Sequence, residues 1–238
     1  MNFDILLPVH NEASTIKFFF DELESELKKD YFKNKNFNCN KVIVIEDGSV
    51  DGTPEIINQI CKSNSIFELH QFRNKLGYVN ALNLAISKSN AEYLIFCDTS
   101  GKYTLSDIQN LLSNLSQCNF IIGKRKKFQD QFYREIIRIF LNFFVSLVFK
   151  KLIHDIDSPF RIIRREDLAE INKFDKVEKN LINLENTIIY LTRLNKNILE
   201  IPINYRMRPQ GKSRGIPLKK VLNVSIGALR TIRFYWKY

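Results

Sequence analysis

The chain has 238 residues, a length typical of one domain or of one domain with a short appendage. Apolar residues make up 45% and charged residues 26%, which is enough apolar material for a core and excludes a disordered chain. The formal net charge of +10 indicates an anionic partner: a nucleic acid, a phosphorylated ligand or a membrane surface.

Strands and helices are predicted to alternate over the first half of the chain. Apolar and β-branched runs predict strands at 3–7, 41–46, 66–71, 92–97 and 120–122. Helical spacing predicts helices at 13–27, 78–87 and 104–115, and Pro54 suits the first turn of another. Such alternation is typical of βαβ units, so we expect an α/β fold with a mainly parallel sheet flanked by helices.

The second half is mostly helical, with one more strand pair expected around 160–163 and 198–205. Residues 204–238 contain nine lysines and arginines and no acid, and residues 123–151 carry a net charge of +6, so the rest of the chain is net acidic. Segments 134–152 and 216–238 read as basic amphipathic helices, and the second ends in aromatic residues. This combination suits a bilayer interface, the alternative being ordinary surface helices packed on the core.

Other classes of protein lack support. The four cysteines are too far apart for a CxxC motif, which predicts free thiols and no zinc site. The first residues do not resemble a signal peptide. The longest apolar stretch, 139–149, is shorter than the ~20 residues that span a bilayer, so no transmembrane helix is expected. Dinucleotide-binding, P-loop and nucleophile-elbow motifs do not occur.

Acidic and polar residues follow three of the predicted strands. The first strand is followed by Asn11 and Glu12, the second ends at Glu46 and is followed by Asp47, and the fourth is followed by Asp98. Parallel sheets bind ligands at the carboxyl ends of their strands. Because clustered carboxylates repel one another without a cation or a donor-rich ligand, these residues predict a binding site at this edge.

These residues resemble the family 2 glycosyltransferases with the GT-A fold. LPVHNEASTI resembles the family's P-x-x-N-E opening, and VIVIEDGSVDGT resembles D-D-G-S-x-D-G-T with Glu46 for the first Asp. NKLGYVNALNLAI resembles the G-x-x-x-A helix start at Gly77 and Ala81. YLIFCDTSGKY stands where the family has its D-x-D metal motif, with Ser100 in place of the second Asp.

The second half resembles the polyprenol-phosphate glycosyltransferases, in particular those like dolichol-phosphate mannosyltransferase. GKR (123–125), DIDSPFRIIRRE and EIPINYRMRPQGKSR match their motifs in order, with Pro159 for a Gly and Arg214 for a Lys. The resemblance covers residues 3 to 214. It divides the chain into a GT-A domain at 1–215 and a basic amphipathic segment at 216–238, expected at a membrane interface.

The resemblance implies an inverting hexosyltransferase that moves a sugar from a nucleotide-diphosphate sugar to a polyprenyl phosphate. Asp98 would hold Mg²⁺ or Mn²⁺ with the donor diphosphate, and Asp47 would hydrogen-bond the nucleobase. The implied donor-binding residues are Pro8, Asn11, Glu12, Glu46, Asp47, Gly77 and Asp98. The implied catalytic residues are Asp98, Arg125, Arg161, Arg208 and Lys212, with Lys102 as a further cation. The implied acceptor-phosphate residues are Arg125, Ser158, Arg208, Ser213 and Arg214.

Three alternatives stay open. The acceptor could be a sugar hydroxyl in surface polysaccharide synthesis, in which case Asp155 or Glu185 is the candidate base, because a hydroxyl needs one and a phosphate does not. Ser100 also allows a non-catalytic sugar-nucleotide-binding module. A nucleic-acid binder lacks any recognition motif. The expected location is peripheral, on the cytoplasmic face of a membrane, with an integral-membrane partner or a homo-oligomer left open.

Overall fold

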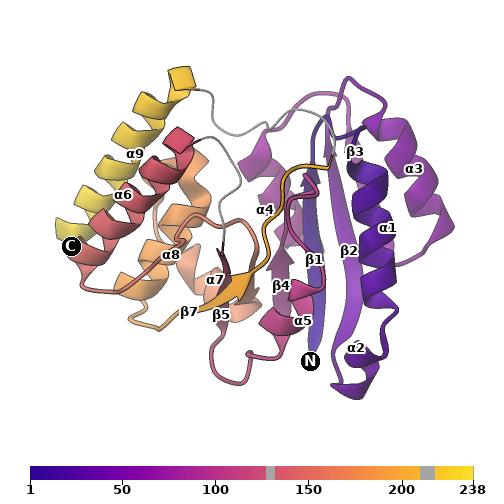
Figure 1. Ribbon diagram of the computed structural model, residues 1–238, viewed down its shortest axis with the longest axis horizontal. Coiled ribbons are helices and arrows are strands. Elements are labelled where there is room, and N and C mark those ends of the chain that lie inside the picture. Colours follow the sequence, from indigo (N-terminus) through magenta and orange to yellow (C-terminus); the bar gives the residue numbers. More distant parts are fainter. Residues whose placement is uncertain (127–131, 210–217, 238) are drawn as a thin grey trace.

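A seven-stranded sheet with helices on both faces forms the centre of the molecule (Figure 1). The computed structural model describes residues 1–126, 132–209 and 218–237. The strands are β1 (Asn2–Val9), β2 (Asn38–Asp47), β3 (Phe67–Phe72), β4 (Tyr93–Phe96), β5 (Phe120–Arg125), β6 (Arg161–Arg164) and β7 (Leu199–Ile203). The helices are α1 (Ile16–Leu27), α2 (Asp30–Asn34), α3 (Thr53–Ser63), α4 (Tyr78–Lys88), α5 (Asp107–Leu112), α6 (Phe132–Phe149), α7 (Arg165–Ile171), the 3-10 turn η1 (Lys179–Leu181), α8 (Ile182–Thr192) and α9 (Leu218–Lys237).

The first four strands confirm the predicted parallel arrangement. The sheet order is β3-β2-β1-β4-β6-β5-β7, and β1 pairs in parallel with β2 and β4. The run from Val42 to Ile45 is completely buried because helices cover both faces of the sheet. The carboxyl ends of β1, β2 and β4 therefore meet at one edge, where the polar residues follow.

The two late strands exist, but they do not pair with each other as predicted. β6 runs antiparallel to both β4 and β5, and β7 pairs in parallel with β5. β5 lies between them: its residues Phe120, Ile121 and Ile122 are almost fully buried and pair with β6, and from Ile121 onward β5 also pairs with β7. A three-residue apolar run carries no sequence signal for such a central position.

Two apolar clusters cover the opposite faces of the sheet. One lies under α1, α3 and α5 and includes Phe19, Ile57 and Leu111. The other lies under α4 and the second-half helices and includes Ile188 of α8 and Ile232 of α9. Because α9 contributes to this core, the described part of the predicted amphipathic C-terminal segment packs on the main domain.

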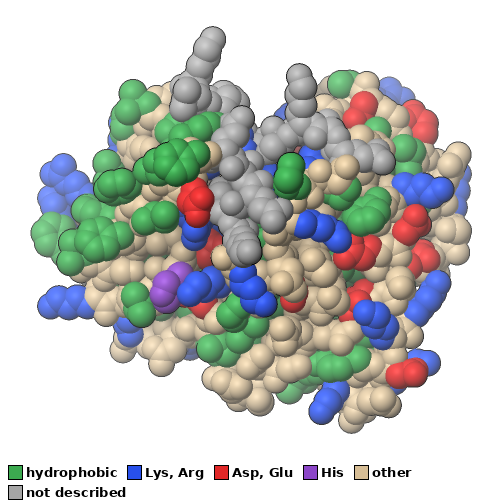
Figure 2. All heavy atoms as spheres, in the orientation of Figure 1, with side chains coloured by type: hydrophobic (Ala, Val, Ile, Leu, Met, Phe, Trp, Pro, Cys, Tyr) green, Lys and Arg blue, Asp and Glu red, His purple; other side chains and the backbone are tan. Residues whose placement is uncertain are grey.

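Helices α6 and α9 lie side by side and leave large apolar side chains in solvent (Figures 1 and 2). We define the α6–α9 face by six such residues, which are 52% to 69% exposed: Phe140, Phe143, Leu147, Leu222, Leu229 and Trp236. Figure 2 shows apolar side chains gathered over these helices, with basic side chains along the outer margin. Within the described part of the chain, no helix is both long and apolar enough to cross a bilayer.

A buried carboxylate fixes α9 to the body of the protein. Glu185 of α8 is 0% exposed and accepts hydrogen bonds from the backbone N–H of Val177 (2.8 Å) and Glu178 (2.7 Å). Its Oε1 also accepts a bond from Thr231 Oγ1 of α9 at 3.3 Å. Burial raises the pKa of Glu185, and these donors partly offset that effect.

Candidate active site

The loops after β1 and β2 brace each other through side chains predicted to bind the donor. Asn11 has a φ of 55°, and its backbone N–H donates to Ser49 Oγ at 2.8 Å. Its side-chain oxygen accepts from the N–H of Val50 at 2.8 Å. Glu46 Oε1 accepts from the N–H of Ser49 at 2.7 Å. Asn11 and Glu46 thus shape the loops that surround the strand ends.

Asp47 connects the end of β2 to the start of α4. Its buried carboxylate accepts hydrogen bonds from the backbone N–H groups of Leu76 and Gly77, the latter at 3.0 Å. Gly77 has a φ of 89°, a backbone conformation that residues other than glycine rarely adopt. The predicted donor residues Asp47 and Gly77 therefore lie together, and Asp47 holds the loop that leads into α4.

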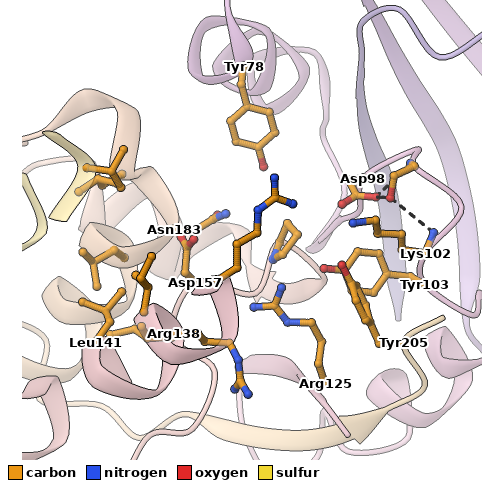
Figure 3. A pocket seen from close by; sticks show the side chains of 18 of the residues that line it. Tyr78, Asp98, Lys102, Tyr103, Arg125, Arg138, Leu141, Asp157, Asn183 and Tyr205 are labelled. Atoms are coloured by element: carbon orange, nitrogen blue, oxygen red, sulfur yellow. Dashed lines mark hydrogen bonds between the residues drawn. The ribbon is translucent and has the colours of Figure 1, made fainter. Parts of the chain in front are cut away.

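A cavity of about 660 Å³ opens at the carboxyl ends of β1 and β4 and extends to α6 and α9 (Figure 3). At the sheet end it is lined by Pro8, His10, Glu12, Asp98 and Lys102. Figure 3 shows Tyr78, Arg125, Arg138, Asp157 and Asn183 along its middle, and Arg134 also lines the cavity. Its far end is apolar and is lined by Ile137, Leu141, Leu184, Val221, Val224 and Ala228. One cavity thus combines an acidic end, a basic middle and an apolar end.

Asp98 is placed to face a ligand with one carboxylate oxygen. Its Oδ1 accepts hydrogen bonds from Ser100 N (3.0 Å) and Ser100 Oγ (2.5 Å), whereas Oδ2 has no such partner among the described residues. No group of three or more metal-binding side chains occurs within the described ranges. Asp98 alone fits a hard divalent cation that takes its other ligands from a diphosphate and water.

Two cations flank the ring of Tyr205 in this cavity. The ammonium of Lys102 lies 5.6 Å from the ring centroid, and the guanidinium of Arg125 also lies 5.6 Å from it. Lys102 is only 8% exposed, and Figure 3 shows it extending alongside Asp98. Positive charge is therefore held beside the acidic end of the cavity, where a ligand's phosphates would reach it.

Arg125 is held by a buried acid. Its Nε and Nη2 donate to the Asp155 carboxylate at 2.7 and 2.5 Å, and Asp155 is 0% exposed. This bidentate pair fixes the guanidinium plane at the cavity wall. Arg125 thus occupies a place that suits its predicted contact with phosphate.

Arg161 and Ser158 do not line the cavity, in contrast to their predicted catalytic and acceptor roles. The buried Arg161 guanidinium donates to the carbonyls of Ser158 (2.7 Å) and Ile156 (3.1 Å) and to Thr187 Oγ1 (3.1 Å). Burial lowers the pKa of Arg161 to about 10. Ser158 is fully buried and donates to the Gly123 carbonyl at 2.7 Å. Both residues hold the segment before β6 in place.

Arg208 lines the cavity and forms an ion pair with Glu12, which also accepts a hydrogen bond from Thr15 Oγ1 at 2.9 Å. The predicted donor residue Glu12 and the predicted cation Arg208 are thus brought together. The predicted residues Lys212, Ser213 and Arg214 lie outside the described residues.

Neither predicted base is placed for proton transfer from a hydroxyl. Asp155 and Glu185 are both 0% exposed and do not line the cavity, because one pairs with Arg125 and the other lies under α9. The structure instead adds residues that were not singled out: Tyr78, Arg134, Arg138, Asp157 and Asn183. The i, i+4 spacing of Arg134 and Arg138 could have indicated a shared helix face.

A family model identifies the family of this chain. Residues 4–171 match the model described as glycosyl transferase family 2. The chain belongs to this family. It is therefore a glycosyltransferase, as the resemblance predicted.

Curated relatives include the dolichyl-phosphate beta-glucosyltransferases of Homo sapiens and Saccharomyces cerevisiae. The human protein is 23% identical over 218 residues, which cover 84% of this chain and 66% of that protein. The yeast protein is 24% identical over 225 residues, with the same coverage of 84% and 66%. The enzyme thus spans slightly less than two thirds of the length of these relatives, and it resembles polyprenol-phosphate sugar transferases as predicted.

Solved structures show the same fold. Glucosyl-3-phosphoglycerate synthase from Mycobacterium tuberculosis, in complex with Mn²⁺, UDP and phosphoglyceric acid, has a TM-score of 0.73 at 15% identity. The match covers 99% of this chain and 78% of that one. The complex of that synthase with Mn²⁺ and UDP-glucose also has a TM-score of 0.73, at 15% identity, with 99% and 79% covered. The predicted GT-A fold is confirmed.

Proposed function

We propose that this enzyme transfers a hexosyl group from a nucleotide-diphosphate sugar to a polyprenyl phosphate, with inversion at the anomeric carbon. The observation that carries the proposal is the cavity, which joins Asp98 at the strand ends to apolar walls on α6 and α9. A nucleotide sugar suits the first end, and a long apolar chain suits the second. The dolichyl-phosphate transferases among the relatives support the same acceptor class.

The basic middle of the cavity suits the acceptor phosphate. Arg125 and Arg138 lie between the two ends, and Arg134, one helical turn before Arg138, also lines the cavity. A phosphate oxygen would form the new bond to the anomeric carbon while the bond from that carbon to the diphosphate breaks and the nucleoside diphosphate leaves. A phosphomonoester has a second pKa near ~6 and is largely deprotonated at pH 7, so the reaction requires no protein base. This agrees with the burial of Asp155 and Glu185.

The leaving diphosphate gains negative charge as the bond breaks, and the acidic end is arranged to receive it. A divalent cation at Asp98, when bound, would neutralise part of this charge as a Lewis acid. Lys102 and Arg208, both lining the same end, would add fixed positive charge. We propose Mg²⁺ or Mn²⁺ as this ion. The Mn²⁺ complexes of the structural neighbours support a divalent cation.

We propose that the α6–α9 face binds to the cytoplasmic face of a membrane. The enzyme would reach the polyprenyl phosphate there. The exposed aromatic and aliphatic residues of the α6–α9 face would enter the headgroup region, and nearby basic residues such as Arg233 and Lys237 would meet anionic lipids. Each basic residue near an anionic leaflet contributes about 1 kcal/mol, screened over ~10 Å at 0.1 M salt. Residues of the same two helices, such as Leu141 and Val221, line the apolar end of the cavity.

Purified enzyme should therefore bind anionic vesicles, with affinity that falls as salt rises but does not vanish, and should bind neutral vesicles weakly. The Phe140→Ser/Phe143→Ser double variant should reduce binding at least ~10-fold, because it removes exposed apolar area that the bilayer would bury. Vesicle co-sedimentation measures both effects. Deleting 216–238 is a poorer test, since it would also uncover the core at Ile232.

The matched control for the membrane prediction is Val50→Ser, which removes a 90% exposed apolar side chain beside the donor loops. It should bind vesicles like the parent protein. Equal loss in both variants, or no vesicle binding by the intact enzyme, would show that α6 and α9 serve only as part of the protein core.

Asp47→Ala should raise the donor KM at least ~10-fold and change kcat much less. Asp47 holds the loop at Leu76 and Gly77, and we propose that it also contacts the nucleobase of the donor. Such contacts are equal in the ground and transition states, so their loss appears in KM. Steady-state kinetics with varied donor measures this. A large loss of kcat at unchanged KM would assign Asp47 to the chemical step instead.

A partition assay tests the function itself. Membranes and purified enzyme are incubated with a panel of labelled UDP- and GDP-sugars and then extracted with organic solvent. We expect label from one donor to enter the lipid phase. Label that stays in water-soluble or polymeric glycan would contradict the proposal and favour a hydroxyl acceptor.

A further inference from the structure

One wall of the cavity carries polar groups that the transfer mechanism does not use. Tyr78 begins α4, Asp157 lies in the loop before β6, and Asn183 is the second residue of α8. Figure 3 shows the three on the side of the cavity across from Asp98, between the acidic and the apolar ends. The sugar of a donor whose diphosphate is bound at Asp98 would face this wall.

The wall is held rigidly from behind. The backbone carbonyl of Asn183 accepts hydrogen bonds from Arg161 Nη1 (3.1 Å) and Thr187 Oγ1 (2.7 Å). Figure 3 shows the side chains of Asn183 and Tyr78 both pointing into this part of the cavity, so α8 and α4 contribute to one wall. The buried Arg161 thus positions the wall without touching the cavity itself. Groups fixed in this way lose little conformational freedom when a ligand binds.

Asp157 presents an uncommitted carboxylate to the cavity. Across residues 1–126, 132–209 and 218–237, it has neither a hydrogen-bond nor an ion-pair partner. Asp157 is exposed to the cavity; its partial removal from bulk solvent raises the pKa of its carboxyl, and the nearby Arg161 and Arg125 oppose that rise. A ligand that donates hydrogen bonds would stabilise a carboxylate in this setting.

The chemistry of these three groups matches a sugar better than a phosphate. Sugar hydroxyls both donate and accept hydrogen bonds. They can therefore donate to the Asp157 carboxylate and exchange hydrogen bonds with the Asn183 amide and the Tyr78 hydroxyl. An aromatic ring such as that of Tyr78, which is 42% exposed, also offers an apolar surface to sugar C–H groups. The Asp157 carboxylate would repel a phosphate, which would bind more favourably beside Arg134 and Arg138 on α6.

We propose that Tyr78, Asp157 and Asn183 form the subsite that binds the hydroxyl groups of the transferred sugar and selects among hexoses. The proposal rests on the proposed function in one respect, that the donor is a nucleotide sugar. A site built to hydrogen-bond a hydroxyl discriminates strongly against a sugar that lacks or misplaces that hydroxyl, because the protein group is then left unpaired.

The test measures donor binding without any acceptor, so it is independent of lipid transfer. Dissociation constants are determined by calorimetry for UDP, GDP and a panel of UDP- and GDP-hexoses that differ at single hydroxyls. The intact enzyme should prefer one hexose over its epimers by at least ~10-fold. In Asp157→Ala and Asn183→Ala this preference should fall to within ~3-fold, with the affinity for the free nucleotide unchanged. The matched control, Asp175→Ala, removes an exposed aspartate outside this cavity and should keep the preference.

Asp157→Asn separates a binding role from a basic one. A hydroxyl-binding Asp157 should tolerate the amide, which keeps one acceptor, and lose far less than Asp157→Ala. Equal loss of kcat in both variants with the sugar preference intact would make Asp157 a base for a hydroxyl acceptor and overturn the subsite. An intact enzyme that does not distinguish hexoses, or variants that distinguish them as it does, would also overturn it. If lipid transfer fails while the hexose preference depends on Asp157, only the acceptor assignment fails.

Discussion

Asp98→Ala should lower kcat at least ~10³-fold while the protein remains folded. Asp98 follows β4, faces the cavity with one carboxylate oxygen and is the group best placed to hold a cation on the donor diphosphate. Losing stabilisation of the leaving group's charge typically costs ~10²–10³ in rate, and here the loss would also release the diphosphate from its position. Stopped assays of transfer, with circular dichroism as the check on folding, measure the effect.

Ser100→Asp provides the matched variant for Asp98. A second carboxylate beside the first should tighten Mn²⁺ binding, measured directly by electron paramagnetic resonance in the presence of UDP, if Ser100 faces the ion. Asp98→Ala should abolish that binding. Transfer by Asp98→Ala within ~10-fold of the parent, or full activity of the parent after exhaustive chelation, would contradict the assignment of a metal to Asp98.

Arg125→Met should lower the free energy of unfolding by about 3–5 kcal/mol in addition to impairing transfer. Asp155 is completely buried and bound bidentately by Arg125, so removing the guanidinium leaves an unpaired charge in the protein interior. For a domain of this size, the midpoint of thermal unfolding should fall by about 10 °C. Urea unfolding with and without the substitution measures the difference.

The double variant Arg125→Met/Asp155→Ala distinguishes a structural pair from a catalytic acid. It should be more stable than Arg125→Met alone, because the unpaired buried charge is gone. Loss of less than ~1 kcal/mol in Arg125→Met would contradict the pairing and return Asp155 to consideration as a base.

The strand-end residues were predictable because their side chains follow regular elements. The positions of Asp47 and Asp98 depend only on where β2 and β4 end, and apolar runs mark those ends clearly. The motif between 155 and 161 was less informative, because a motif match does not give the direction of a side chain. Arg161 points into the protein and Asp157 toward the cavity, and this depends on how the loop packs against α8.

The amphipathic helices show a similar limit of prediction from the sequence. Helical spacing predicted both α6 and α9, since spacing is a local property. The same spacing did not show that α9 would pack on α8 through Thr231 and Glu185, which are 46 residues apart. The cavity wall at Tyr78 and Asn183 was equally unpredictable from the sequence, because these residues come from α4 and α8 and line one cavity only in the folded chain.

Transfer to defined acceptors tests the central claim most directly. The enzyme is given its preferred labelled nucleotide sugar and either a polyprenyl phosphate or the matching polyprenol, each in the same anionic vesicles. We predict that label enters the lipid phase with the phosphate, does not do so with the alcohol, and is lost with Asp98→Ala. Equal labelling of both lipids, or labelling of neither while a free sugar hydroxyl is glycosylated, would contradict the proposed function.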